Sequence, residues 1–189
     1  VDLLQREHTP EQEKEYLAVL DRQAHKLKKL TVDLVEMSKA STGNIPCHIA
    51  RRSVRELIDQ TVGEYAERLA LAQLEPVVTL PDEELYCLCD GALLWRVLDN
   101  LFSNACKYAC AGTRLYIGAK RIGDTVEFSF KNISRDALNI DPNELMERFV
   151  RGDSSRTTEG SGLGLNIAKS LVELQKGTFS LAIDGDLFK

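Results

Sequence analysis

Residues 151–165 read Arg-Gly-Asp-Ser-Ser-Arg-Thr-Thr-Glu-Gly-Ser-Gly-Leu-Gly-Leu and lead directly into Asn-Ile-Ala-Lys-Ser-Leu-Val-Glu-Leu at 166–174. Gly160, Gly162 and Gly164 allow the backbone to come close to a ligand, since they carry no side chain. The pattern that follows predicts a helix, whose first turn presents N–H groups without partners inside the helix. Together these features predict a cradle for an anion such as a phosphate. Alone the cluster is weak support, because most short glycine clusters are only turns or helix starts.

The segment 151–159 precedes this cradle and is rich in hydroxyl side chains. Its two arginines, Arg151 and Arg156, are candidate contacts for phosphate oxygens, because a guanidinium group donates paired N–H bonds to phosphate. We therefore expect this segment to act as a lid that orders over bound phosphates.

A second informative stretch, Leu-Asp-Asn-Leu-Phe-Ser-Asn-Ala-Cys-Lys-Tyr at 98–108, lies inside a predicted helix that starts after Asp90. At about 100° per residue, Asn100, Asn104 and Lys107 gather on one face of this helix. The opposite face is apolar and consists of Leu94, Val97, Leu98, Leu101 and Ala105. An amide oxygen suits Mg²⁺, a lysine suits a phosphate, and Tyr108 lies at the border of the two faces, where a flat base could pack. A merely solvated face is the alternative, but two amides and a lysine upstream of a glycine cradle favour a nucleotide site.

These stretches resemble the motifs of sensor histidine kinases. NLFSNACKY at 100–108 resembles their N box, LMERFVRGD at 145–153 their F box with the start of the ATP lid, and GSGLGLNIAKSLVE at 160–173 their last glycine box. The resemblance implies a Bergerat-type ATP-binding fold, shared with gyrase, Hsp90 and MutL, from about residue 45 onward. The preceding residues resemble the second half of a dimerisation helical hairpin.

The resemblance also implies roles for individual residues. Asn104 would coordinate Mg²⁺, Asn100 would assist with the metal or the phosphates, Lys107 would contact a phosphate, and Tyr108 would pack against adenine. In the F box Phe149 would anchor the lid, and Arg148 and Arg151 would face the nucleotide or the lid. The glycine box, with Gly160, Gly162, Leu163, Gly164 and Leu165, would line the triphosphate. The chemistry would be phosphoryl transfer from ATP, which depends on positioning and charge neutralisation.

One departure from the family pattern concerns base recognition. The family's first glycine box is usually DxGxG, but 131–137 read Lys-Asn-Ile-Ser-Arg-Asp-Ala, with Asn132 where the aspartate is expected. An asparagine can still accept from the adenine amino group and donate to the neighbouring ring nitrogen. Asp136 and Asp141 are weaker substitutes, because they fall beyond the predicted strand. The alternative is a dimerising signalling scaffold that does not bind nucleotide.

A second departure concerns the phosphoacceptor. The family's histidine lies in His-Glu-x-x-Thr-Pro, and that motif is absent from residues 1–189, where His8 directly precedes Thr9-Pro10. His25 and His48 are interpreted as ordinary surface or interface residues. The resemblance implies that the whole protein phosphorylates a histidine upstream of Val1, passes the group to an aspartate of a response-regulator receiver domain, and is anchored in the bacterial cell membrane. The fragment itself is expected to be cytoplasmic, to make no membrane contact and not to autophosphorylate.

The N-terminal region predicts a helix that starts with Thr9 as N-cap and Pro10 at the first helical position. A heptad seam follows at alternating spacings of four and three: Tyr16, Leu20, Gln23, Leu27, Leu30, Leu34 and Met37. Leu17, Ala24 and Thr31 widen the stripe, as expected for a homodimeric four-helix bundle. An amphipathic helix lying on its own domain is the alternative.

Two domains are therefore expected, a partial dimerisation hairpin at 1–43 and a catalytic ATP-binding domain at 44–189. In the second, Ser53-x-x-Glu56 reads as a capping box before a helix. Strands are expected at 76–80, 85–89, 113–120, 125–131 and 178–183, with turns at 122–124 and 184–186. Helices on one side of a mostly antiparallel sheet predict an α+β fold, a two-layer α/β sandwich.

Composition argues against several further kinds of partner and site. A net charge of −5 and a pI near 5.3 argue against nucleic acid as a partner. The five cysteines form no CxxC pair, so we expect reduced thiols and no metal site among them. No apolar run reaches the roughly 18 residues of a membrane span. An ATPase of the Hsp90, MutL or gyrase kind would require glutamate in place of Asn100, and a serine kinase acting on anti-sigma partners would not require the heptad helix.

Overall fold

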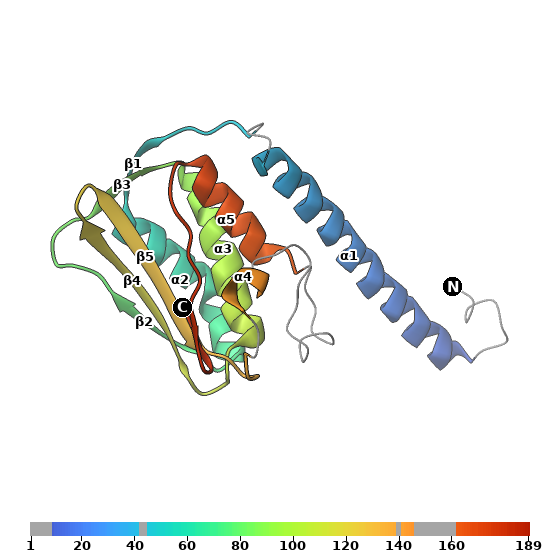
Figure 1. Ribbon diagram of the computed structural model, residues 1–189. Helices are drawn as coiled ribbons and strands as arrows, with labels where there is room; N and C mark the ends of the chain where they lie inside the picture. The colour runs from blue at the N-terminus through green and yellow to red at the C-terminus, as the bar shows by residue number, and fades with distance from the viewer. Residues whose placement is uncertain (1–8, 42–44, 139–140, 146–161) are drawn as a thin grey trace.

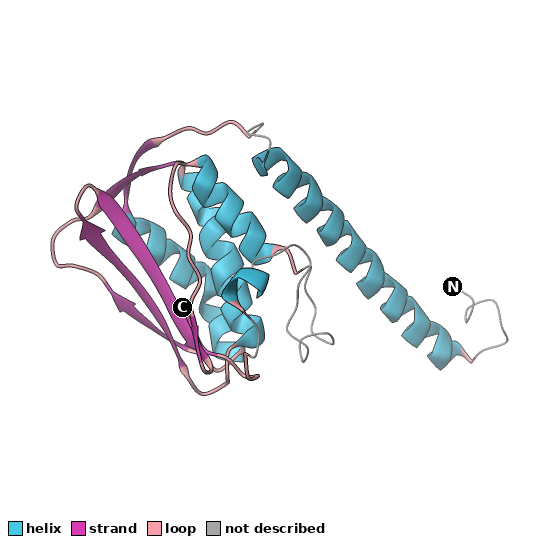
Figure 2. Cartoon of the chain, viewed as in Figure 1, coloured by secondary structure: helices cyan, strands magenta, loops and turns pink. Residues whose placement is uncertain are grey.

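The computed structural model describes residues 9–41, 45–138, 141–145 and 162–189. Within them the chain forms one long helix followed by a two-layer domain, whose helices cover one face of a β-sheet (Figure 1, Figure 2). The predicted α+β two-layer architecture is therefore confirmed. None of the described helices combines the length and the apolar character that crossing a lipid bilayer requires.

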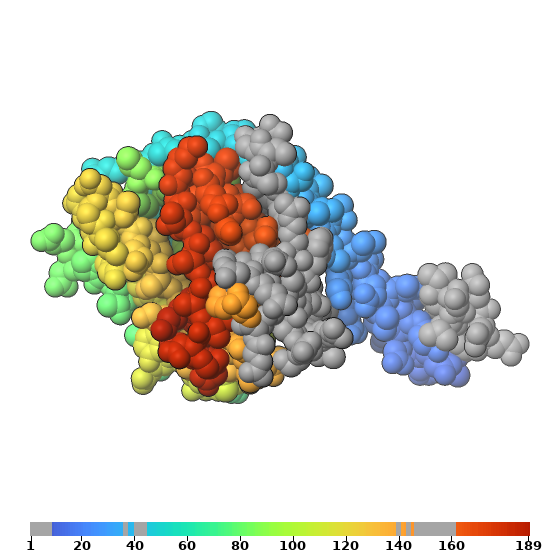
Figure 3. Space-filling model, viewed as in Figure 1, coloured from blue at the N-terminus to red at the C-terminus, as the bar shows by residue number. Residues whose placement is uncertain are grey.

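The long helix α1 spans Pro10–Ser41 and begins with a reciprocal cap. The Gln12 N–H donates to the Thr9 hydroxyl at 3.3 Å, and the Thr9 N–H donates to the Gln12 side-chain oxygen at 2.9 Å. The predicted helix start is confirmed. The N-terminal part of α1 projects away from the domain (Figure 3). Large apolar side chains on α1 are exposed, namely Leu17, Val19, Leu27, Val32, Leu34 and Val35.

The main sheet has five strands in the order β2-β4-β5-β7-β6. β2 (Glu75–Thr79) runs parallel to β4 (Arg114–Ile122), and β4 pairs antiparallel with β5 (Thr125–Ile133). The short strands β6 (Ile183–Asp184) and β7 (Leu187–Phe188) form a hairpin on the other side of β5. A separate two-stranded sheet joins β1 (Ala50–Ser53) to β3 (Tyr86–Cys89).

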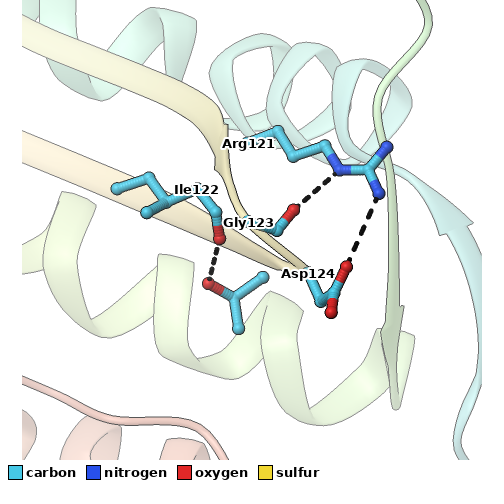
Figure 4. Close-up of polar contacts among 5 residues, drawn as sticks. Arg121, Ile122, Gly123 and Asp124 are labelled. Carbon is cyan, nitrogen blue, oxygen red and sulfur yellow. Dashed lines mark hydrogen bonds and ion pairs between the residues drawn. The ribbon is translucent and has the colours of Figure 1, made fainter.

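The turn between β4 and β5 confirms the predicted hairpin. Ile122 pairs with Thr125, so the loop consists of Gly123 and Asp124, and Gly123 adopts a φ of 58° that favours glycine. Arg121 Nε donates to the Gly123 carbonyl at 2.9 Å, and the Thr125 hydroxyl donates to the Ile122 carbonyl at 2.9 Å (Figure 4). These bonds fix the register of the two central strands.

Three helices of the domain share two apolar clusters. α2 (Val54–Leu71), capped at Ser53 as predicted, and α3 (Gly91–Tyr108) pack on the sheet. α5 (Gly164–Leu174) packs against α3, and a single turn, α4 (Pro142–Leu145), precedes it in sequence. The cluster under the sheet includes Ile58, Tyr65, Leu69, Leu98, Phe102, Leu115 and Ile117. The cluster between α3 and α5 includes Leu93, Leu94, Val97, Leu163, Ile167 and Leu171. α3 contributes to both clusters, which explains why its apolar face is wide.

The C-terminal strand prediction was wrong in extent. We predicted a strand at 178–183, but the strands are only Ile183–Asp184 and Leu187–Phe188, extended by two backbone hydrogen bonds between Ala182 and Lys189. β7 pairs with β5 at Asn132 and Ile133. Alternating apolar residues favour extended backbone without specifying a neighbouring strand, and a strand requires that neighbour. The predicted turn is correct, since Gly185 adopts a φ of 63° in the loop between β6 and β7. The strand β1 was missed, because Ala50–Ser53 is short and carries two arginines.

Candidate nucleotide-binding site

Asp90 fixes where the motif-bearing helix α3 begins. Its Oδ1 accepts the N–H groups of Ala92 at 2.9 Å and Leu93 at 3.1 Å, and its Oδ2 accepts the His48 N–H at 2.7 Å. The Asp90 N–H donates to Gln175 Oε1 at 2.8 Å. The His48 N–H, followed by those of the first turn, lowers the pKa of the buried Asp90 carboxyl against the opposing effect of burial. The Asp90 carboxylate thus joins the linker after α1 to the start of α3, and its backbone N–H adds a bond to the end of α5.

The charge of Asp90 should make stability depend on pH. A carboxyl with a lowered folded pKa adds stability that is complete above its unfolded pKa of about 4 and is lost as pH falls through the folded value. We expect Asp90→Asn to lower the free energy of unfolding by about 1 kcal/mol at neutral pH and by less below about pH 4. Urea unfolding at several pH values measures this. The exposed Asp124→Asn is the control, and a loss for Asp90→Asn that does not vary with pH would contradict the assignment.

Asn100 and Gly164 bring the two predicted motifs together. Asn100 Nδ2 donates to the Arg96 carbonyl at 2.8 Å, which orients the amide on the surface of α3. A Cβ atom added to Gly164 would lie 3.0 Å from Asn100 Oδ1. The start of α5 therefore approaches the amide so closely that only glycine fits without displacement. Figure 1 shows the two helices side by side.

This contact predicts a cost for a single methyl group. We expect Gly164→Ala to displace the Asn100 amide and to weaken nucleotide binding by about tenfold, since a misplaced polar contact is worth on the order of 1 kcal/mol. The matched control is Gly63→Ala in α2, where an added Cβ meets nothing within 4 Å. Gly63→Ala should stabilise the fold by up to about 1 kcal/mol through helix propensity and leave binding unchanged. Equal binding by both variants would count against the contact.

Asn104 follows Asn100 by one helical turn and is half-buried. Among the residues that the structure describes, its side chain has no hydrogen-bond partner. Its amide oxygen is therefore not committed to another described group. A carboxamide oxygen is a suitable ligand for Mg²⁺, so the donor chemistry fits the metal that the sequence predicts.

Lys107 lies near the end of α3 and is half-buried. Burial is the largest cause that lowers the pKa of its amine, followed by the positive charges of Lys29 and Arg68. Asp33 and Asp99 act in the opposite direction. An amine that is desolvated and next to other cations gains from a nearby anion, which agrees with a phosphate contact. Lys29 and Asp33 belong to α1, so the long helix extends the electrostatic environment of this site.

Tyr108 and Asn132 lie where the end of α3 meets the end of β5. The Arg135 N–H donates to the Tyr108 carbonyl at 2.8 Å, and the Cys110 N–H donates to the Ile133 carbonyl at 2.8 Å. Asn132 is only 8% exposed, and its side-chain amide has no hydrogen-bond partner within the described part of the chain. Buried amides are normally hydrogen-bonded, so this one is suited to the polar edge of a ligand.

The glycine box is described from Gly162 onward. Gly162 has a φ of 73°, Leu163 is fully buried in the cluster between α3 and α5, and Leu165 is half-buried. Leu163 stands at the N-cap of α5 and supplies no side-chain cap to it. An N-terminus with no side-chain cap suits an anion. The remaining predicted site residues lie outside the described residues: Arg148, Phe149, Arg151, Arg156 and Gly160.

Two contributors to the site were missed from the sequence. The first is the pair Lys29 and Asp33, which the heptad pattern of α1 does not single out. The second is Asp90, whose place in the sequence indicates only that a helix follows it. Its preference for an N-cap position was a usable signal, whereas its bonds to His48 and Gln175 join segments too distant in sequence to be inferred.

Comparison with known proteins relates this chain to a family. Residues 89–185 match the family described as Histidine kinase-, DNA gyrase B-, and HSP90-like ATPase. The signal transduction histidine-protein kinase BaeS of Escherichia coli strain K12 is 30% identical over 174 residues, which cover 91% of this chain and 36% of BaeS. The chain therefore spans little more than a third of that relative.

Solved structures agree on the fold. Full-length ShkA in complex with AMPPNP has a TM-score of 0.75 at 23% identity, covering 97% of this chain and 39% of ShkA. The histidine kinase ThkA in complex with the response regulator protein TrrA has a TM-score of 0.70 at 19% identity, covering 96% of this chain and 51% of ThkA.

Proposed function

Because this chain belongs to the family of histidine kinase-, DNA gyrase B- and HSP90-like ATPases, we propose that it is the ATP-binding catalytic part of a sensor histidine kinase. The observation that carries the proposal is the approach of Gly164 to Asn100, which puts the helix bearing the amides against the start of the glycine-box helix. Phosphoryl transfer needs this kind of arrangement, because it relies on positioned polar groups and backbone N–H groups more than on a covalent catalyst.

Each residue then has a defined task. The Asn104 side-chain oxygen, assisted by Asn100, holds Mg²⁺, which neutralises phosphate charge when bound. Lys107 supplies a cation to a phosphate, and the start of α5 from Gly162 supplies backbone N–H groups. At the other end of the site, the Asn132 amide bonds the adenine edge and Tyr108 packs against the ring. Arg148, Phe149, Arg151, Arg156 and Gly160 complete the lid and the phosphate cradle.

In the whole protein, the γ-phosphoryl group of ATP passes to a histidine and from there to an aspartate of a response-regulator receiver domain. Support comes from BaeS, a histidine-protein kinase by name, and from the ThkA structure, which contains a response regulator. Residues 1–189 contain no His-Glu-x-x-Thr-Pro motif, so we expect this chain to bind ATP without phosphorylating itself. The apolar side chains left exposed on α1 support pairing of two copies through this helix.

Calorimetric titration with Mg-AMPPNP tests the proposal. We expect saturable binding of one nucleotide per chain that is lost when Mg²⁺ is chelated, because the metal neutralises charge between the phosphates and the protein. A phosphotransfer assay should then give labelled phosphate on a separately supplied dimerisation hairpin that contains the histidine motif. No saturable heat at any nucleotide concentration would contradict the proposal.

A signalling scaffold that does not bind nucleotide is the second candidate. It is favoured by the asparagine at position 132, where the family has aspartate, and by the exposed apolar side chains of α1. The scaffold predicts self-association in sedimentation experiments with no nucleotide binding, so the same titration separates the two functions.

A further inference from the structure

Cys87 and Cys89 form a close pair of thiols on β3, outside the candidate nucleotide site. Residues two apart on a strand point to the same face, and here the two Sγ atoms lie 3.5 Å apart. Cys89 is buried at 6% exposure and Cys87 is half-buried. On the opposite face, Tyr86 and Leu88 are exposed. The pair is thus held in contact within a paired strand, with one sulfur partly accessible.

The two thiols are chemically unequal. The hydrogen bond between the two sulfurs, in which either thiol can donate, is the largest cause that lowers the pKa of the Cys87 thiol. The pKa of Cys89 is raised, first by this same bond and then by burial. Arg52, which stands opposite Cys87 in the β1–β3 pairing, is a favourable positive charge for a Cys89 thiolate. Cys87 is also the more accessible of the two sulfurs, so it is the one that reacts first, and the positive charge of Arg52 favours a thiolate at Cys89.

We propose that Cys87 and Cys89 are a reversible two-electron redox site whose substrate is hydrogen peroxide. The Cys87 thiolate attacks a peroxide oxygen, so that an S–O bond forms, the O–O bond breaks, and the departing hydroxide takes up a proton to become water. The sulfur of Cys89, after losing its proton, attacks the Cys87 sulfenic acid. An S–S bond then forms, the S–O bond breaks, and a second water leaves. The two thiols are oxidised by two electrons and the peroxide is reduced by two. A dithiol then returns the pair to two thiols by disulfide exchange and is itself oxidised to a disulfide.

Two other roles for these thiols, a metal site and a purely structural role, have less support. Within the described part of the chain, no group of three or more histidine, cysteine, aspartate or glutamate side chains could hold a metal ion, so the pair lacks further ligands. A purely structural role would not require both sulfurs to be in contact, with the more acidic one half exposed. The redox site also does not depend on nucleotide binding.

Oxidation of the Cys87–Cys89 pair should destabilise the first turn of α3. A disulfide needs its sulfurs about 2.05 Å apart, so bonding residues two apart must distort β3 and its pairing with β1. β3 runs directly into Asp90, which holds the His48 N–H and caps the first turn of α3. Weakening one of these bonds should raise amide hydrogen exchange in residues 91–94 by about tenfold.

Intact-mass measurement of the full 189-residue chain tests the proposal. With stoichiometric hydrogen peroxide, the wild type should lose the mass of two hydrogen atoms and regain it with dithiothreitol. Peptide mapping should place the bond between Cys87 and Cys89. Cys89→Ala should instead stop at a Cys87 sulfenic acid that dimedone traps. Cys87→Ala should form neither the disulfide nor a sulfenic acid that dimedone traps. Circular dichroism of each variant confirms folding before oxidation.

The other half-buried cysteines supply matched controls. Cys47→Ser and Cys106→Ser remove thiols whose pKa is raised by burial, and both variants should form the bond at the wild-type rate. The proposal is overturned by a wild type that keeps all its thiols, by a disulfide that maps to Cys47, or by unchanged hydrogen exchange in 91–94 after the bond has formed.

Discussion

Asn104→Ala is expected to weaken binding of Mg-AMPPNP by about 100-fold or more, which corresponds to about 2.7 kcal/mol. The residue is half-buried on α3 next to the Asn100–Gly164 contact, and its amide has no hydrogen-bond partner among the described residues. Removing a ligand from the metal should therefore remove the Mg²⁺-dependent part of the affinity while leaving the fold intact. Calorimetry with and without Mg²⁺ measures both parts.

Two variants make this result specific. Asn104→Asp keeps an oxygen ligand for Mg²⁺ and should lose less affinity than Asn104→Ala. Gln60→Ala removes an exposed amide that bonds only Glu64 among the described residues, and it should bind as the wild type does. If Asn104→Ala binds Mg-AMPPNP with unchanged affinity, Asn104 is not the metal ligand.

Phe102→Ala is expected to lower the free energy of unfolding by about 3–5 kcal/mol. Phe102 is fully buried, and its ring centroid lies 5.1 Å from that of Tyr65 and 5.6 Å from that of Phe130. It thus ties α3 to α2 and to the sheet, and removing the ring leaves a cavity that two rigid layers cannot close. A domain of ordinary stability would lose a large part of its 5–15 kcal/mol.

Urea unfolding followed by tryptophan fluorescence measures this loss, since Trp95 lies on the same helix. The matched control is Leu71→Ala at the end of α2, where the side chain is 78% exposed. That variant should change the free energy of unfolding by no more than about 0.5 kcal/mol. A Phe102→Ala loss as small as the Leu71→Ala loss would show that the ring is not central to the core.

Much of the fold could be predicted from sequence patterns, because those patterns involve residues close to one another in the chain. The apolar face of α3 was predicted correctly at Leu94, Val97, Leu98 and Ala105, all of which are buried. The helix starts at Thr9 and Ser53 and the turn at Gly123 were also correct. Each depends on residues within a few positions of one another, whose geometry is set by helical or strand periodicity and by side-chain capping.

The family was also identified correctly from the order of its motifs, but the roles of the individual site residues stay predictions. The order explains why Asn100 and Gly164 were expected at one site, and the structure adds their close approach. Two strand predictions failed. The C-terminal strand was predicted too long, since its apolar alternation does not specify a partner strand, and β1 was missed.

The order of residues alone determined most helices and strands, their buried faces and the nucleotide-binding family. These follow from interactions between neighbouring residues and from recurring motifs. Folding in three dimensions added what no local pattern contains. It brought Lys29 and Asp33 of α1 close enough to act on the charge of Lys107, buried Asn132 with its amide unpaired among the described residues, and placed Arg52 opposite Cys87 in the β1–β3 pairing. These arrangements involve segments that are far apart in the chain, so they depend on how whole surfaces pack together.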